Sequence, residues 1–369
     1  MTRLHDLYTE QGQSPWLDNL RRGWIASGEL QRWIDRGVRG LTSNPTIFAK
    51  AMMETSDYDR DLASMLGSGA SVDDAYWRLV TADITQALGL LAPVHESSAG
   101  VDGYVSVEVA PALAHDEAGT VQAARRLHDS IAAPNLYVKV PATVEGVAAI
   151  ETLIGEGRSI NVTLIFSRQR YGQVMEAYLR GLERLAAADP SASLAGVSSV
   201  ASFFVSRVDV EIDRRLEALG TPEAQALRGR AAVAQAQLAY GQFRQVFSGP
   251  RWEALEARGA RLQRPLWAST STKDPSYPDT LYVDTLIGPD TVNTLPDATL
   301  TAFEDHGTVA RTVDADPEAA GAVFDELDSL GINIEAVAQQ LETEGVNAFA
   351  KSFDEVLSAL ADRSESLRS

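Results

Sequence analysis

The stretch Leu136-Tyr137-Val138-Lys139-Val140-Pro141 has the pattern of a buried β-strand that a single lysine interrupts. Because strand side chains alternate between two faces, the aliphatic residues share one face and Lys139 points from the other. Burying an ammonium group is costly, and a desolvated lysine loses proton affinity. Such a lysine is a nucleophile for carbonyl compounds. The plainer alternative is a surface lysine on a half-exposed edge strand.

Similar short runs recur along the chain and alternate with amphipathic helical patterns. The predicted strands cover residues 15–20, 40–44, 104–109, 136–140, 159–166, 198–205, 265–271 and 291–295. The clearest helical patterns cover residues 72–91, 120–132, 168–187, 207–219 and 222–247. Alternation of strands with helices is typical of a parallel sheet, and eight strands favour an α/β fold of the (β/α)₈ TIM barrel type over an open doubly wound sheet.

The segment after the eighth predicted strand has a helical pattern and no further strand. We therefore expect one barrel domain over residues 1–369, in which a C-terminal helical extension from about residue 297 to 369 packs on the barrel as a cap. The intervals 46–103 and 209–264 are long enough for additional helices.

Composition excludes several classes of partner. The net charge of −19 argues against binding to nucleic acid or to an anionic membrane surface. No apolar run approaches the roughly 18 residues of a membrane span, and the N-terminal residues lack the apolar core of a signal peptide. The absence of cysteine is compatible with a reducing cytoplasm, which is the location we expect. The five histidines lack metal-ligand spacing, so no metal site is predicted.

Polar side chains interrupt other predicted strands in the same way as Lys139. Asp18 lies in the first strand, Glu108 in the third, and Asn161 and Thr163 in the fifth, each opposite aliphatic neighbours. If the aliphatic faces pack against helices, all of these side chains face the barrel interior, where they would form a site for acid–base chemistry around one amine. The plainer alternatives are an ion-paired Glu108 and, for Asn44, the cap of a helix.

Four segments together are similar to motifs of the transaldolase family. They are residues 40–48, 137–143, 161–167 and 201–207, which read GLTSNPTIF, YVKVPAT, NVTLIFS and ASFFVSR. The motifs follow one another in the family's order from the second predicted strand to the sixth. The chain resembles the longer-chain bacterial type of transaldolase.

The resemblance implies a barrel enzyme, without a cofactor, that acts on sugar phosphates. It implies transfer of a dihydroxyacetone unit from sedoheptulose 7-phosphate to glyceraldehyde 3-phosphate in the pentose phosphate pathway, giving erythrose 4-phosphate and fructose 6-phosphate. Lys139 matches the Schiff-base lysine, and Asp18 matches the general acid/base. Glu108 and Thr163 match the pair that holds a catalytic water. A homodimer is a common assembly in the family.

The resemblance also implies a set of substrate-binding residues. Positions that contact the bound carbon chain are matched by Asn44, Asn161 and Ser202, and Arg207 matches a phosphate-binding position. Barrels commonly bind phosphate after strands seven and eight, so Ser269, Ser271 and Lys273 could complete that site. Phe204 stands where transferases carry phenylalanine and where related aldolases carry a polar residue, and an apolar side chain there would exclude water.

Two alternatives to a transaldolase stay open. The first is a lyase similar to fructose-6-phosphate aldolase, which releases free dihydroxyacetone, and Phe204 argues against it. The second is a barrel that binds sugar phosphates without catalysis. The complete set of Asp18, Glu108, Lys139 and Thr163 argues against that second alternative.

Overall fold

Eight parallel strands close into a barrel in the computed structural model, in the order β1 to β8. The structure describes residues 1–191 and 193–368, with side chains to residue 363. The strands are β1 (Gln13–Leu17), β2 (Leu41–Thr42), β3 (Val105–Glu108), β4 (Leu136–Pro141), β5 (Ile160–Ile165), β6 (Ser199–Phe204), β7 (Arg264–Ala268) and β8 (Thr291–Leu295). The predicted (β/α)₈ fold is confirmed.

Strand register accounts for the alternation seen in the sequence. Val138 pairs with Val107 of β3 and with Ile160 of β5, and these aliphatic side chains are fully buried. Lys139, the next residue, pairs with Glu108 and Asn161. Since partners in adjacent strands project to the same side of a sheet, the polar set and the aliphatic set occupy opposite faces.

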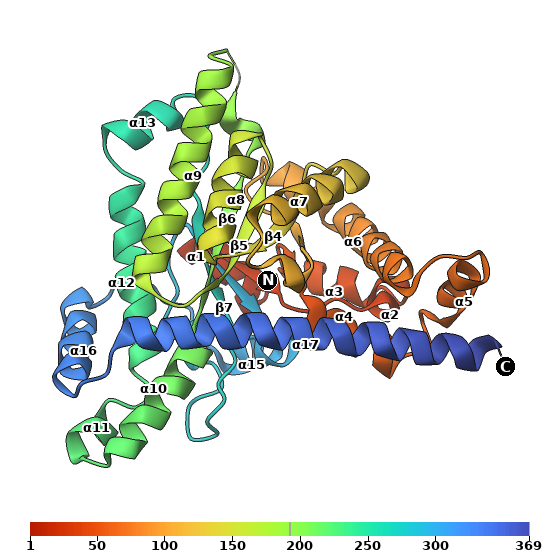
Figure 1. The fold of residues 1–369 in the computed structure, drawn as a ribbon. Coiled ribbons are helices and arrows are strands. Elements are labelled where there is room, and N and C mark those ends of the chain that lie inside the picture. Colours follow the sequence, from red (N-terminus) through yellow and green to blue (C-terminus); the bar gives the residue numbers. More distant parts are fainter. Residues whose placement is uncertain (192, 369) are drawn as a thin grey trace.

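Helices surround the barrel, and further short helices lie before β1 and between the strands. Seven of them are α6 (Val72–Ser97), α7 (Glu117–Ile131), α8 (Val144–Gly155), α9 (Arg168–Ala188), α10 (Ser206–Leu219), α12 (Ala231–Val246) and α15 (Asp297–His306) (Figure 1). The shorter elements are α1 (Arg3–Gln11), α2 (Arg22–Ala26), α3 (Glu29–Asp35), α4 (Pro45–Glu54), α5 (Asp59–Gly67), α11 (Pro222–Ala226), α13 (Pro250–Glu256) and α14 (Leu281–Asp284), with 3₁₀ turns η1 (Pro111–Leu113) and η2 (Leu194–Gly196).

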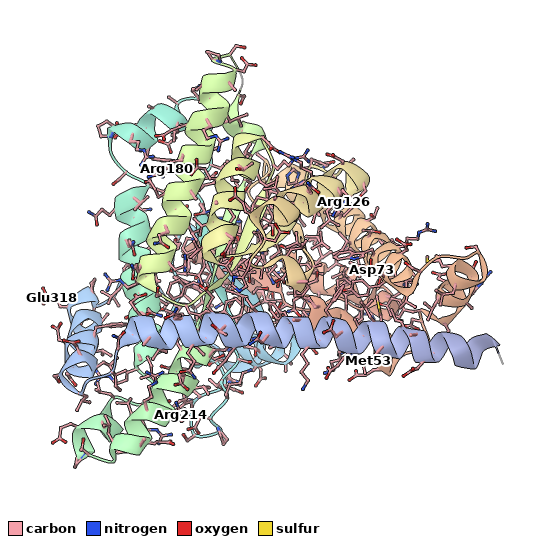
Figure 2. All side chains as sticks on the ribbon, viewed as in Figure 1. Met53, Asp73, Arg126, Arg180, Arg214 and Glu318 are labelled. Atoms are coloured by element: carbon pink, nitrogen blue, oxygen red, sulfur yellow. The ribbon has the colours of Figure 1, made fainter. Side chains whose placement is uncertain are left out.

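Side-chain caps fix where the helices that follow the strands begin. Thr143 caps α8 by accepting a hydrogen bond from the Gly146 N–H, and Ser167 caps α9 in the same way from the Arg170 N–H. Caps of this kind satisfy backbone donors that have no partner within the helix. On the outer surfaces of the helices, charged side chains such as Arg180 and Arg214 project into solvent (Figure 2).

Six of the eight predicted strands are shorter in the structure than the sequence suggested, and the ends of β1 and β2 bear on the site. β1 ends at Leu17, so Asp18 directly follows the strand rather than lying in it. β2 covers only Leu41–Thr42 because Asn44 already caps α4, with its Oδ1 accepting from the Ile47 N–H at 2.9 Å. The helix-cap interpretation of Asn44 is therefore confirmed.

The predicted helix over residues 222–247 is divided into α11 and α12. Gly229 lies between them with a φ of +70°, in the left-handed region that ends helices. Two carboxylates of α10 accept hydrogen bonds at this break. The Gly229 N–H donates to Asp213 at 2.9 Å, and the Ala232 N–H donates to Asp209 at 2.7 Å. The break follows from these buried acceptors, which have no counterpart in the local pattern of apolar residues.

After β8 and α15, the chain forms α16 (Pro317–Ser329) and the long helix α17 (Ile334–Arg368). Figure 1 shows α17 in dark blue, running across one side of the barrel. It contacts α4, α5, α6, α10, η1 and β5, elements that place it over the carboxyl ends of the strands. None of the described helices combines the length and apolarity that a membrane crossing requires.

Candidate active site

A cavity of about 130 Å³ lies at the carboxyl end of the barrel. Catalytic sites of TIM barrels form at this end. The cavity is lined by Asp18, Thr42, Asn44, Lys139, Thr163, Ser202, Phe204, Arg207, Ala268, Ser269, Ser271, Lys273, Thr294, Pro296 and Phe349. The structure therefore gathers most of the predicted site residues around one space, and leaves Glu108 and Asn161 just behind its wall.

Lys139 is buried at the base of this cavity, with 4% of its surface exposed. Its Nζ lies 3.2 Å from Glu108 Oε2 and donates to the backbone carbonyl of Ser43 at 3.2 Å. A closed barrel has no edge strand, so the surface-lysine alternative is wrong. The amine is instead held in place beside a carboxylate.

Asp18 lines the cavity directly after the end of β1. Its Oδ1 accepts from Thr42 Oγ1 at 2.7 Å, and the Thr42 hydroxyl also contacts that of Thr294 at 2.6 Å. Burial raises the pKa of Asp18, while the charge of Lys139 and the Thr42 hydrogen bond oppose the rise. A carboxyl group with a raised pKa can exchange a proton with substrate at neutral pH, which is what a general acid/base requires.

Glu108 and Thr163 supply two more groups that can handle protons. Burial raises the pKa of Glu108, and the Lys139 ammonium opposes that rise. Thr163 Oγ1 is buried and makes no hydrogen bond within the described residues. Buried hydroxyls are normally satisfied, so Thr163 is available to a ligand or a water molecule.

Asn161 is buried behind the cavity wall and is not one of the residues that line it. Its amide nitrogen donates to Ser106 Oγ at 3.0 Å, and its oxygen accepts from Ser202 Oγ at 2.7 Å. Ser202 itself lines the cavity. In this geometry Asn161 orients the Ser202 hydroxyl, and its direct contact with substrate stays a prediction.

The opposite end of the cavity is basic. Arg207 makes no ion pair or hydrogen bond within the part of the chain that the structure describes, and its guanidinium lies over the Phe204 ring at 5.2 Å. Burial lowers the pKa of Arg207. Lys273 is exposed and donates to Ser271 Oγ at 2.6 Å, and its pKa is lowered by partial desolvation and then by Arg207. Neither cation forms an ion pair with a carboxylate among the described residues, an arrangement that suits an anionic ligand.

Ser269 connects the two segments that carry Arg207 and Lys273. The Ser206 N–H donates to the Ser269 carbonyl at 2.9 Å, and the two hydroxyls lie 2.8 Å apart. Ser269 has a φ of +55°, a strained conformation for a residue other than glycine. The contact joins the end of β7 to the start of α10, and Arg207 lies in the first turn of that helix.

Sequence reasoning missed five residues that line the cavity: Thr42, Ala268, Thr294, Pro296 and Phe349. Thr42 stands within a predicted strand motif, so its alternation with Leu41 could have indicated an inward hydroxyl. Phe349 comes from α17, and nothing in its local sequence points to a site formed by strands far earlier in the chain.

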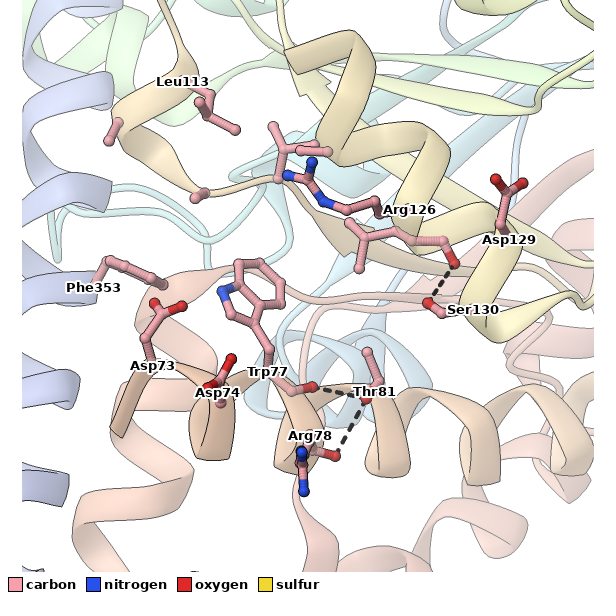
Figure 3. A pocket seen from close by; sticks show the side chains of 15 residues that line it. Asp73, Asp74, Trp77, Arg78, Thr81, Leu113, Arg126, Asp129, Ser130 and Phe353 are labelled. Atoms are coloured by element: carbon pink, nitrogen blue, oxygen red, sulfur yellow. Dashed lines mark hydrogen bonds between the residues drawn. The ribbon is translucent and has the colours of Figure 1, made fainter. Parts of the chain in front are cut away.

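A second cavity of about 1010 Å³ lies on the outer flank, between α6 and α7. Figure 3 shows Trp77 at its centre, with Phe353 of α17 on one side and Arg126 of α7 above. Although it is larger, this cavity contains no predicted site residue. The convergence of buried titratable groups favours the smaller cavity as the active site.

Comparison with known proteins identifies the family of the chain. A family model described as transaldolase/fructose-6-phosphate aldolase matches residues 15–360. The chain is 51% identical to the transaldolase of Thermobifida fusca (strain YX), over 96% of both chains. It is 49% identical to the transaldolase of Parafrankia sp. (strain EAN1pec), over 95% of both. It is also 49% identical to the transaldolase of Mycobacterium bovis (strain BCG / Pasteur 1173P2), over 94% of this chain and 93% of that one. By sequence, fold and the residues gathered in its cavity, this chain is an enzyme that belongs to the transaldolase family.

Proposed function

We propose that this enzyme transfers a dihydroxyacetone unit from sedoheptulose 7-phosphate to glyceraldehyde 3-phosphate through a Schiff base on Lys139. The products would be erythrose 4-phosphate and fructose 6-phosphate, in the pentose phosphate pathway of the cytoplasm. The observation that carries the proposal is a buried lysine, paired with a carboxylate, at one end of a cavity whose other end holds an unpaired arginine.

The chemistry begins with attack of the Lys139 amine on the substrate ketone. Glu108 and Thr163 would move protons through a water molecule while the carbinolamine loses water to form the imine. General acid–base groups contribute roughly 10²–10⁴-fold each, which is the contribution asked of this pair and of Asp18.

Asp18 would then remove the proton from the C4 hydroxyl, and the C3–C4 bond breaks with its electron pair drawn into the imine. The aldehyde fragment leaves, and the remaining three-carbon carbanion stays attached to Lys139. It attacks the carbonyl carbon of glyceraldehyde 3-phosphate, whose oxygen regains the proton from Asp18. Hydrolysis of the new imine releases fructose 6-phosphate and restores the amine.

The basic end of the cavity supports a phosphorylated substrate. Arg207 offers a planar fork that suits a phosphate group, and Lys273 adds a second charge nearby. In a chain with a net charge of −19, two cations facing one cavity are a local exception that an anionic ligand would explain.

Transfer is favoured over release of free dihydroxyacetone because the cavity wall includes Phe204. Its ring packs against Phe166 at 5.1 Å, and only 6% of the residue is exposed. An apolar wall beside the imine disfavours an ordered water molecule there.

The test is to incubate the enzyme with fructose 6-phosphate, with and without erythrose 4-phosphate as acceptor. The proposal predicts sedoheptulose 7-phosphate with acceptor and little dihydroxyacetone without it. Dominant release of dihydroxyacetone would favour the lyase. Lys139→Ala should abolish transfer while Lys351→Ala, at an exposed position of α17, leaves it unchanged. Unchanged activity in Lys139→Ala would refute the covalent mechanism, and binding without turnover in the wild type would favour the non-catalytic barrel.

A further inference from the structure

The C-terminal helix places one aromatic side chain over the cavity. Phe349 of α17 is 5% exposed and lines the space shared by Lys139 and Arg207. Its ring centre lies 5.9 Å from Lys139 Nζ and 6.0 Å from Arg207 Cζ. The ring therefore covers both the nucleophile and the unpaired cation, from a part of the chain that contributes no strand.

Contacts one turn before and one turn after Phe349 hold the helix in place. At Gly345, a Cβ would lie 2.9 Å from Leu164 Cδ2 and 3.5 Å from an Arg207 nitrogen, so the backbone of α17 rests closely on the end of β5. On the other side, Phe353 packs edge-on against Tyr76 of α6 at 5.1 Å. The position of Phe349 over the cavity is thus fixed from both sides.

The backbone of β5 is strained at the point where α17 meets it. Leu164 has a φ of +59°, and the pairing of β5 with β6 shifts register between Val162 and Ile165. Leu164 directly follows Thr163, which lines the cavity. The contact with Gly345 consequently links the placement of α17 to the polar wall of the site.

We propose that Phe349 is a specificity-determining residue, an apolar roof that keeps water from the Lys139 intermediate so that the three-carbon unit passes to an aldehyde. This inference rests on the proposed function. Together with Phe204, the roof makes the space around the imine apolar on two sides. Water is disfavoured on these two apolar sides, whereas the water that serves imine formation and hydrolysis has polar partners in Glu108 and Thr163.

The competing reaction consumes one water molecule. The carbanion takes a proton at carbon, and water then adds to the imine carbon to give a carbinolamine. Its C–N bond breaks, the amine nitrogen takes up the proton of the hydroxyl group, and free dihydroxyacetone leaves. Removing the roof should accelerate this addition of water while the aldol chemistry, which depends on Asp18, keeps its groups.

The experiment measures the ratio of dihydroxyacetone release to transfer, with fructose 6-phosphate as donor and erythrose 4-phosphate as acceptor. We expect Phe349→Ala to raise this ratio about tenfold or more, which corresponds to about 1.4 kcal/mol. Phe349→Gln, a polar side chain of similar reach, should raise it as well and serves if the alanine variant does not fold. Phe349→Leu keeps an apolar roof and should stay near wild type.

Lys351→Ala is the matched control, because Lys351 lies at an exposed position of α17 two residues beyond Phe349 and makes none of the contacts that hold Phe349 over the cavity. It should leave the ratio within about twofold of wild type. This is well below the tenfold change, or about 1.36 kcal/mol in activation free energy, expected of Phe349→Ala. An unchanged ratio in both Phe349→Ala and Phe349→Gln would overturn the inference, as would an equal rise in Lys351→Ala. Borohydride trapping on Lys139 in the wild type separates this failure from failure of the proposed function, which would leave no adduct at all.

Discussion

Lys139 Nζ lies 3.2 Å from Glu108 Oε2, and each side chain is only 5% exposed. The two residues are registered partners of β4 and β3, so the strands themselves hold the pair together. Burying two charged groups costs desolvation energy. A role of the carboxylate in the chemistry of the amine would explain why the barrel keeps this pair buried.

Glu108→Gln should therefore slow imine formation strongly. The amide cannot accept or return a proton, so the expected loss of turnover is roughly 10²–10⁴-fold. The rate at which borohydride-reducible adduct forms on Lys139 measures this step directly. Glu117→Gln, at an exposed position in the first turn of α7, is the control and should keep the wild-type rate. A wild-type rate of adduct formation in Glu108→Gln would remove Glu108 from the mechanism.

Arg207→Ala should weaken use of phosphorylated donors specifically. Loss of charge-assisted hydrogen bonds to phosphate costs about 1.5–3 kcal/mol, or roughly 10- to 150-fold in kcat/KM. Activity with unphosphorylated fructose should change little. Arg214→Ala is the control on the same helix, because Arg214 is exposed and pairs with Glu211. An equal loss with both donors would mean that Arg207 does not bind the phosphate.

Asp209→Asn should change how stability depends on pH. Burial raises the pKa of Asp209 to about 7, although its oxygens accept from the Ala232 N–H and from the Tyr282 hydroxyl. The folded protein then holds a proton that the unfolded chain releases near its ordinary pKa of 3.8. Stability from this group is therefore lost as pH rises toward and through 7.

The variant lacks this titration, so its stability relative to wild type should improve by about 2–3 kcal/mol between pH 5 and pH 8. Urea unfolding at both pH values measures the difference. A stability difference that is the same at the two pH values would show that Asp209 does not titrate in this range.

Asp102→Ala should destabilise the amino end of the barrel. Asp102 accepts from Arg39 at 2.7 Å and from Arg264 at 2.9 Å, as well as from Ser14 and Trp16. Burial alone would raise the pKa of Asp102, but the two guanidinium groups together hold it below its ordinary value. Removing the carboxylate leaves these cations unpaired.

The expected cost is about 3–5 kcal/mol in the free energy of unfolding. Asp129→Ala breaks a pair with Arg158 in which the Asp129 side chain is 69% exposed, and should cost about 1 kcal/mol or less. Denaturant unfolding of both variants makes the comparison. Equal losses would show that the Asp102 network does not stabilise the barrel as argued.

Much of the fold and of the site follows from strand alternation alone. Inward polar residues such as Glu108 and Lys139 could be read from their aliphatic neighbours because the period of two is a local property. The end of β1 before Asp18 and the break at Gly229 could not, since they depend on partners from distant elements. Phe349 is the clearest case, because only the path of α17 brings it over strands that lie far earlier in the chain. The single-domain division, with its extension over residues 297–369, and the homodimer stay predictions.

The most direct test of the central claim is peptide mass spectrometry after treatment with fructose 6-phosphate and borohydride. The account predicts a reduced three-carbon adduct on the peptide that contains Lys139. The Lys139→Arg variant should give none while still binding the sugar phosphate, because a guanidinium stays protonated and cannot form an imine. A folded wild-type protein that binds fructose 6-phosphate but yields no adduct, or an adduct on another lysine, would contradict the account.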